Sequence, residues 1–139
     1  MLNTTGWIPD IPDHRDYTLD HAEIKALISR NKKYMALAKT KALPKSVDLR
    51  EWCSPIEDQG NLGSCSAHAG VGALEFCEDK NFGKYLDASR LFLYKVTRNL
   101  LGITGDQGAS LRATMKAMAK FGVPPEKYWP YDIKKFDEE

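Results

Sequence analysis

The feature that most constrains this chain is a loop with two glycines that runs directly into a cysteine at a predicted helix start. The segment reads Gln59-Gly60-Asn61-Leu62-Gly63-Ser64-Cys65-Ser66-Ala67. Its glycines permit positive φ and a close approach by another backbone. The unpaired N–H groups and the dipole of a first helical turn favour an anion, so we expect a stabilised thiolate at Cys65. Because a thiolate is the nucleophile in acyl transfer, Cys65 is the candidate catalytic residue.

Gln59 lies six residues before Cys65 and offers a second group that this chemistry needs. Its side-chain amide and the backbone N–H of Cys65 could both donate hydrogen bonds to a developing oxyanion. A lone Gly-Ser-Cys would more often be a buried structural cysteine. The function therefore has to be argued from the surrounding sequence.

The residue pattern of the sequence changes at Leu43-Pro44. Residues 1–42 form an N-terminal extension, which opens with a proline-containing stretch and continues with a predicted helix over 20–41, capped by Asp20. Residues 43–139 form the main body, for which we predict a small, mostly helical lobe. Helical periodicity and glycine stop signals place three helices there: 65–80, 87–99 and 110–121.

The composition narrows the function classes. A formal net charge of +1 does not indicate binding to nucleic acid or to an anionic membrane. No apolar run approaches the roughly 18 residues of a membrane span. Cys53, Cys65 and Cys77 are too few for a disulfide framework, and their spacing matches no zinc motif. We expect no metal and no cofactor. A reducing, cytoplasmic compartment is favoured, with secretion left open as the alternative.

The segment around Cys65 resembles the nucleophile motif of the papain-like cysteine peptidases (peptidase family C1), in which Gln-Gly and a short spacer precede Gly-Ser-Cys. Further stretches resemble this family in the same order along the chain, over roughly residues 43–132. They are Leu43-Pro44 with Val47-Asp48-Leu49-Arg50, Ser54-Pro55-Ile56, the glycine-rich loop 105–109, Phe121-Gly122-Val123 and Tyr128-Trp129-Pro130-Tyr131.

The resemblance implies an α+β papain-like fold, of which residues 43–139 would be the helical left lobe, incomplete without a C-terminal lobe. It implies a cysteine peptidase that hydrolyses peptide or protein substrates through an acyl-enzyme. By motif position, Cys65 would be the nucleophile and Gln59 the oxyanion donor. Gly108 would pair with the substrate backbone. The same substrate-binding wall would include Gly63, Ser64 and Asp106.

The family also needs a histidine base and an orienting asparagine, roughly 130–150 residues beyond the cysteine. This chain stops at Glu139, and its three histidines are His14, His21 and His68. His68 is predicted to be a packed histidine, because a base must face the thiol across a cleft. Three explanations stay open: a truncated enzyme, one chain of a processed enzyme, or a natural half-protein. We favour the first two, with the histidine and asparagine on a C-terminal lobe or a second chain.

Two other functions are weighed against the peptidase. One is a non-catalytic half that binds a partner, or forms a homodimer, through an apolar face built from large side chains. The residues predicted for that face are Phe92, Tyr94, Met115 and Trp129. The other is a transglutaminase-like acyl transferase, which the spacing between Gln59 and Cys65 disfavours.

Two departures from the common family pattern favour a prokaryotic branch. Leu62 stands where a disulfide-forming cysteine is usual, and residues 101–109 contain no partner cysteine. Ser66 replaces the usual tryptophan. Residues 1–42 occupy the place of a zymogen prosegment, so they are expected either to restrict access to Cys65 or to be a structural strap of the mature fold.

Overall fold

The chain is described by a computed structural model that covers residues 6–31, 36 and 45–138. It divides into two compact units. The first joins the N-terminal segment that ends at Asp10 to the part of the chain that starts at Leu49. The second is Ile11–Asp48.

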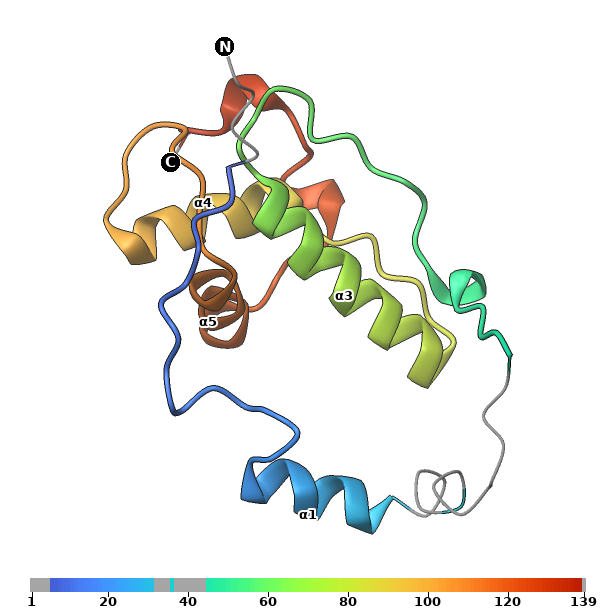
Figure 1. Cartoon of the computed structure of the whole chain (residues 1–139). Helices are drawn as coiled ribbons and strands as arrows, with labels where there is room; N and C mark the ends of the chain where they lie inside the picture. Colours follow the sequence, from blue (N-terminus) through green and yellow to red (C-terminus); the bar gives the residue numbers. More distant parts are fainter. Residues whose placement is uncertain (1–5, 32–35, 37–44, 139) are drawn as a thin grey trace. The chain divides into compact units, whose positions relative to one another are not determined.

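Three helices pack against one another in the first unit: α3 (Cys65–Phe82), α4 (Arg90–Leu101) and α5 (Leu111–Phe121) (Figure 1). Three short 3-10 turns accompany them: η1 (Arg50–Trp52), η2 (Glu126–Tyr128) and η3 (Ile133–Lys135). Extended pairing in the described residues is confined to two isolated bridges, Trp7 with Ala109 and Ala88 with Pro125. The predicted mostly helical lobe is confirmed.

Local sequence signals explain where these helices begin and end. Helix α3 stops at Gly83, which adopts the left-handed conformation (φ 61°) that glycine tolerates best. The hydroxyl of Ser89 accepts the N–H of Phe92 at 3.2 Å, so α4 starts at Arg90, two or three residues later than predicted. Ser110 caps α5 in the same way, and Gly122 ends it as predicted.

The core lies where the three helices meet. Its buried members are mostly alanines and branched residues: Leu62, Ala67, Val71, Ala88, Leu91, Leu93, Tyr94, Ala109 and Ala117. Gly70 shows why small residues are needed at the crossing. A Cβ atom on Gly70 would lie 3.1 Å from Thr114 Cγ2 and 3.2 Å from Met118 Cε, both on α5. The absence of a side chain at Gly70 therefore lets α3 and α5 pack closely.

A buried ion pair joins α3 to α4. Arg90 Nη2 lies 3.0 Å from Glu75 Oε2, and both residues are almost inaccessible to solvent. Glu75 also accepts the backbone N–H of Ala88 at 3.0 Å. Asp87 supplies a second, more exposed carboxylate 3.3 Å from the same guanidinium. Both charges are therefore compensated, as buried charges must be.

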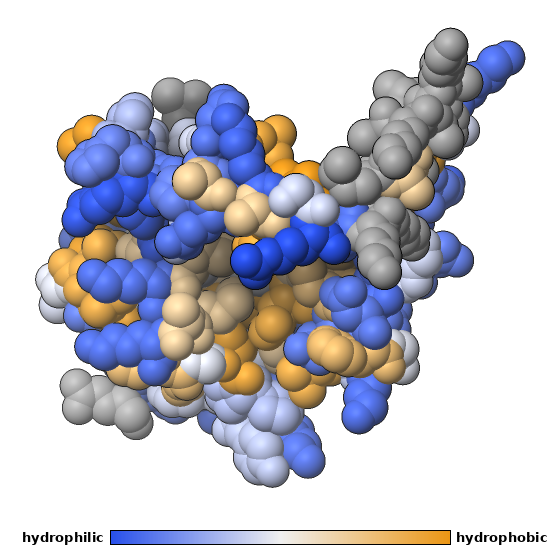
Figure 2. All heavy atoms as spheres, turned by 90° about the horizontal axis from the view of Figure 1, so that it is seen from below, coloured by the Kyte–Doolittle hydropathy of each residue, from blue (hydrophilic) through white to orange (hydrophobic). Residues whose placement is uncertain are grey.

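Several large apolar side chains of the first unit remain exposed, including Phe82, Met115 and Phe121. Figure 2 shows hydrophobic residues reaching the surface between hydrophilic ones on one face of the chain. The predicted apolar face is corrected at Tyr94, which is fully buried because its helix faces the core at that position. No helix in the described ranges has the length and apolar character required to cross a bilayer.

The second unit contains one helix, α1 (Ala22–Arg30), within its described residues. The expected cap is wrong. His21, and not Asp20, is the N-cap, because its ring Nδ1 accepts the N–H of Glu23 at 3.3 Å while Asp20 pairs with Lys25. The remainder of the helix predicted up to residue 41 falls mostly outside the described residues.

Candidate active site

Cys65 is the first residue of α3 and stands between two buried serines. Ser64 and Ser66 are almost fully buried, whereas Cys65 is half-buried and has a free thiol. The chain turns into the helix through Gly60, whose φ is +58°. The two serine side chains are thus buried in the protein, while the thiol between them stays partly accessible.

The thiol of Cys65 does not show the stabilised anion that the sequence predicts. Burial raises its pKa above the ordinary value, although the backbone N–H groups of Ser66 and Cys65 itself favour the thiolate. Burial therefore has a larger effect on this pKa than the two N–H groups have. This shift favours the neutral thiol over the thiolate.

Gln59 begins the loop and is half-buried. Its side-chain Nε2 donates to the carbonyl of Leu62 at 2.9 Å, so the amide braces its own loop. Its backbone carbonyl accepts the hydroxyl of Tyr131 at 3.0 Å. Asp58 closes the turn beside it, because its carboxylate accepts the N–H of Gly60 at 2.8 Å.

Ser64 and His68 form a small polar cluster with Tyr131. The hydroxyl oxygens of Ser64 and Tyr131 are 2.6 Å apart. His68 Nδ1 lies 3.1 Å from the Ser64 carbonyl oxygen, and its ring meets that of Tyr131 edge to face. In the described part of the chain, the hydrogen bonds of His68 go to Ser64 and none goes to Cys65. Burial lowers the pKa of His68, which favours the neutral ring of a packed histidine.

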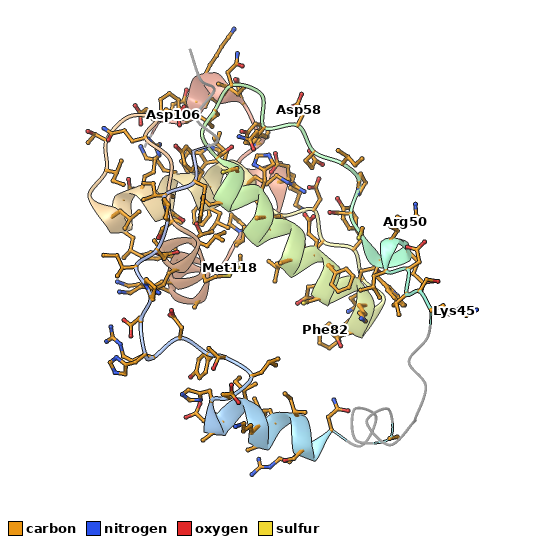
Figure 3. The ribbon with its side chains drawn as sticks, viewed as in Figure 1. Lys45, Arg50, Asp58, Phe82, Asp106 and Met118 are labelled. Atoms are coloured by element: carbon orange, nitrogen blue, oxygen red, sulfur yellow. The ribbon has the colours of Figure 1, made fainter. Side chains whose placement is uncertain are left out.

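A chain of hydrogen bonds connects the loop before Cys65 to the glycine-rich loop 105–109. The N–H of Gly63 donates to both carboxylate oxygens of Asp106, at 3.0 and 3.1 Å. The hydroxyl of Tyr94 donates to Asp106 Oδ1 at 2.5 Å and accepts the N–H of Gly108 at 3.1 Å. Figure 3 shows Asp106 at the end of the molecule where α3 starts. Gly63, Asp106 and Gly108, predicted separately as substrate-binding residues, are therefore brought together.

Tyr94 is the member of this network that the sequence did not identify. Burial raises its pKa, and the hydrogen bond to Asp106 raises it further. The phenol therefore keeps its proton and acts as a donor. The available signal was a tyrosine among the aliphatic residues of a predicted buried helix face, because a buried hydroxyl needs a partner.

The segment from Gly6 to Asp10 lies on the same wall of the lobe. The N–H of Ala109 donates to the Gly6 carbonyl at 2.8 Å, and the N–H of Ile8 donates to the Ala109 carbonyl at 3.0 Å. A Cβ atom on Gly108 would lie 1.9 Å from the Gly6 oxygen, so these two glycines are in backbone contact. The segment thus pairs with the edge that Gly108 was predicted to offer to a substrate.

Asp10 fastens the end of this segment to the start of α5. Its carboxylate accepts the N–H of Arg112 at 3.0 Å and lies 3.8 Å from the guanidinium of the same residue. Burial alone would raise the pKa of Asp10, but hydrogen bonds from Arg112, Ser110 and Leu111, together with the Arg112 charge, hold it below its ordinary value. An acidic side chain at a helix N-terminus is also favoured by the helix dipole.

Comparison with known proteins adds to this geometry. The profile of the papain family cysteine proteases matches residues 43–138. An uncharacterized peptidase C1-like protein of Acanthamoeba polyphaga mimivirus is 39% identical over 136 residues, which cover 94% of this chain and 43% of that protein. The thiol protease aleurain of Arabidopsis thaliana is 33% identical over 92 residues, covering 65% of this chain and 26% of its own. Xylellain, a cysteine protease from Xylella fastidiosa, has a TM-score of 0.64 at 38% identity, covering 91% of this chain and 42% of its own.

These matches confirm the predicted fold class, with this chain as the helical left lobe of a papain-like fold. The chain spans less than half the length of each of these relatives. They come from a virus, a plant and a bacterium, so the prokaryotic branch stays a prediction.

Proposed function

Because this chain belongs to the papain family of cysteine proteases, we propose that it is the nucleophile-bearing part of a cysteine peptidase. The Cys65 thiolate attacks the carbonyl carbon of a peptide bond. The N–H of Cys65 and the side-chain amide of Gln59 hold the oxyanion. A histidine from outside this chain, which has taken the proton of the Cys65 thiol, gives that proton to the leaving amine as the C–N bond breaks and the thioester forms. Water then hydrolyses the thioester, which releases the acid and regenerates the thiol.

The position of Cys65 carries this proposal. A cysteine with a purely structural role at the start of α3 would be packed into the core, as the flanking Ser64 and Ser66 are. Cys65 is instead the accessible side chain of the three. Gln59 stands close by, in a loop that Tyr131 holds at two points. Its amide would exchange the Leu62 carbonyl for the oxyanion when a substrate binds.

A C-terminal lobe or a second chain is proposed to supply the missing base. His68, which lies one helical turn beyond Cys65, has its ring Nδ1 within hydrogen-bonding distance of Ser64. The solvent-facing side of α3 below Cys65 carries small residues, including Ala69, Gly72 and Ala73. A face of this kind allows a second body to approach the helix closely, which is what a histidine opposite the thiol requires.

The N-terminal segment is proposed to restrict access to the cleft. Gly6 and Ile8 use both backbone hydrogen-bonding groups of Ala109, and Gly6 contacts Gly108. A substrate that paired with this wall would have to displace them. The segment therefore acts as a prosegment rather than as a passive strap, and removal of residues 1–10 should speed labelling of Cys65 by a peptide-shaped thiol reagent. An unchanged rate would favour the strap.

The test of the catalytic proposal is hydrolysis of a fluorogenic peptide by the protein in its native, full-length form. We expect Cys65→Ala to abolish hydrolysis and Gln59→Ala to slow it by about 10²–10³-fold, as for other oxyanion donors. Hydrolysis that persists in Cys65→Ala would refute the assignment. A protein that hydrolyses nothing but shows a concentration-dependent mass by light scattering would support the alternative, a self-associating half that forms a homodimer.

A further inference from the structure

Two loops of the lobe meet although no covalent link joins them. One is 59–63, which precedes Cys65, and the other is 105–109, which carries Gly108. Neither contains a cysteine. Contact between them is nevertheless close, because a Cβ atom on Gly63 would lie 2.9 Å from Asp106 Oδ1 and 3.5 Å from the Gly108 nitrogen. Non-covalent contacts must therefore keep these two backbones at that separation.

We propose that Tyr94 and Asp106 act as one positioning couple that sets the separation of Gly63 and Gly108. Asp106 holds the Gly63 N–H, and the Tyr94 hydroxyl holds the Gly108 N–H. The two acceptors are joined by the hydrogen bond from the Tyr94 hydroxyl to Asp106. A hydroxyl that accepts at its oxygen while it donates its proton strengthens both bonds. A change in the hydrogen bond of one glycine amide should therefore affect the other amide through Tyr94 and Asp106.

The couple is fixed in place by the core on one side. Tyr94 is fully buried in α4, and the guanidinium carbon of Arg98 lies 4.7 Å from the centre of its ring. Arg98 is also buried and donates to the carbonyl of Gly105 at 2.6 Å, directly before Asp106. The phenol and the loop residue before Asp106 thus share one rigid support. Asp106 itself is exposed, so the hydroxyl is the part of the couple that solvent does not compete for.

A different account is that the hydrogen bonds of Tyr94 and Asp106 form independently and merely satisfy local polar groups. The two accounts differ in one respect. In the coupled account, removal of the Asp106 carboxylate changes the environment of the Gly108 amide, which Asp106 does not bond. In the independent account it does not. The importance of the couple for catalysis rests on the proposed function, but the coupling itself can be measured without any catalytic activity.

The experiment is amide hydrogen exchange by NMR on the full chain, followed at Gly63 and Gly108. In Tyr94→Phe, which keeps the ring under Arg98, we expect Gly108 to exchange about three- to tenfold faster, the effect of one lost hydrogen bond. Gly63 should also exchange faster and shift its resonance. In Asp106→Ala, both amides should respond. Asp106→Asn should restore most of the protection, because its amide oxygen can accept from both Tyr94 and Gly63.

Two variants serve as matched controls. Asp58→Ala removes another loop carboxylate that accepts a glycine N–H, and Tyr128→Phe removes an exposed phenolic hydroxyl. Neither substitution should alter the exchange rate of the Gly108 amide. The proposal is overturned if Asp106→Ala leaves Gly108 unchanged, or if Tyr94→Phe leaves Gly63 unchanged. If Asp106→Ala does not fold, the response of Gly63 in Tyr94→Phe decides the question. A positive result, together with no peptide hydrolysis by the native, full-length protein, would uphold the couple and refute the peptidase.

Discussion

Tyr131 brings its hydroxyl oxygen to within 2.6 Å of the hydroxyl oxygen of Ser64, the residue before Cys65. The same phenol donates to the carbonyl of Gln59 at 3.0 Å. The proton between the first two oxygens is therefore supplied by Ser64. One side chain near the end of the chain thus holds both ends of the loop that carries the candidate oxyanion donor and the thiol.

Tyr131→Phe tests that arrangement. It removes two hydrogen bonds and leaves the Ser64 hydroxyl buried without this acceptor, so we expect a loss of about 1–2 kcal/mol in the free energy of unfolding. The measurement is urea denaturation followed by circular dichroism. Tyr128→Phe, at an exposed phenol, is the control and should stay within about 0.5 kcal/mol of the wild type. Equal effects of the two substitutions would contradict the role given to Tyr131.

The pH dependence of Cys65 alkylation tests the state of the thiol. Burial raises the Cys65 pKa, so less thiolate is present at neutral pH. We expect the rate of reaction with iodoacetamide to rise with a midpoint at or above the roughly 8.5 of free cysteine. His68→Asn should leave that midpoint unchanged, because His68 is bonded to Ser64.

Labelling sites in this experiment are assigned by mass spectrometry, with Cys65→Ala to separate Cys53 and Cys77. A midpoint well below 8.5 that disappears in His68→Asn would make His68 the base and remove the need for an external histidine. Addition of the proposed external histidine, by contrast, should make the midpoint fall, because an imidazolium beside the thiolate stabilises it.

Glu75→Gln tests the ion pair that joins α3 to α4. The substitution leaves a buried guanidinium with Asp87 as its nearest remaining carboxylate. We expect a loss of about 3 kcal/mol in the free energy of unfolding, typical of breaking one side of a buried pair. Glu51→Gln, at an exposed position in η1, should cost little. A small effect for Glu75→Gln would mean that the pair adds little to stability.

Asp10 makes the attachment of the N-terminal segment dependent on pH. The pKa of Asp10 in the folded chain lies below its ordinary value of about 3.9. The ionised carboxylate therefore stabilises the attached segment fully above that ordinary value, and this stabilisation is lost as the pH falls through the lower pKa of the folded chain. The Ala109 amide, which donates to Gly6, reports the attachment. Its chemical shift should hold steady from pH 7 to pH 5 and then move in acid.

In Asp10→Ala the Ala109 amide should already show the detached shift at pH 7, while circular dichroism confirms that the helices are intact. Asp20→Ala, at an exposed carboxylate of the other unit, is the control. Identical pH courses for wild type and Asp10→Ala would exclude Asp10 as the clamp.

The helices of the lobe could be predicted because their signals are local. Serine caps and glycine stops act on their own helix, so the limits of α4 and α5 came within two or three residues. His21 shows where such signals fail. Asp20 and His21 are adjacent and both can cap, and the choice depends on the salt bridge that Asp20 makes with Lys25.

The residues of the site could be predicted from the sequence, but the hydrogen bonds that connect them could not. Gly63, Asp106 and Gly108 were identified one by one from motif positions. Their partner Tyr94 was expected on an exposed face, since a tyrosine on a helix does not reveal which loop will reach its hydroxyl. The raised pKa of Cys65 was missed for a related reason, because burial depends on packing from distant parts of the chain.

The bond between Asp10 and Arg112 spans 102 positions of the chain. Contacts within and between neighbouring helices close far shorter loops, and short loops close faster and at lower entropic cost. We therefore expect α3, α4 and α5 to assemble first and the segment at Gly6–Asp10 to dock last. Every newly folded molecule would then pass through an interval in which the backbone groups of Ala109 are still unpaired, and the length of that interval is set by the rate of docking.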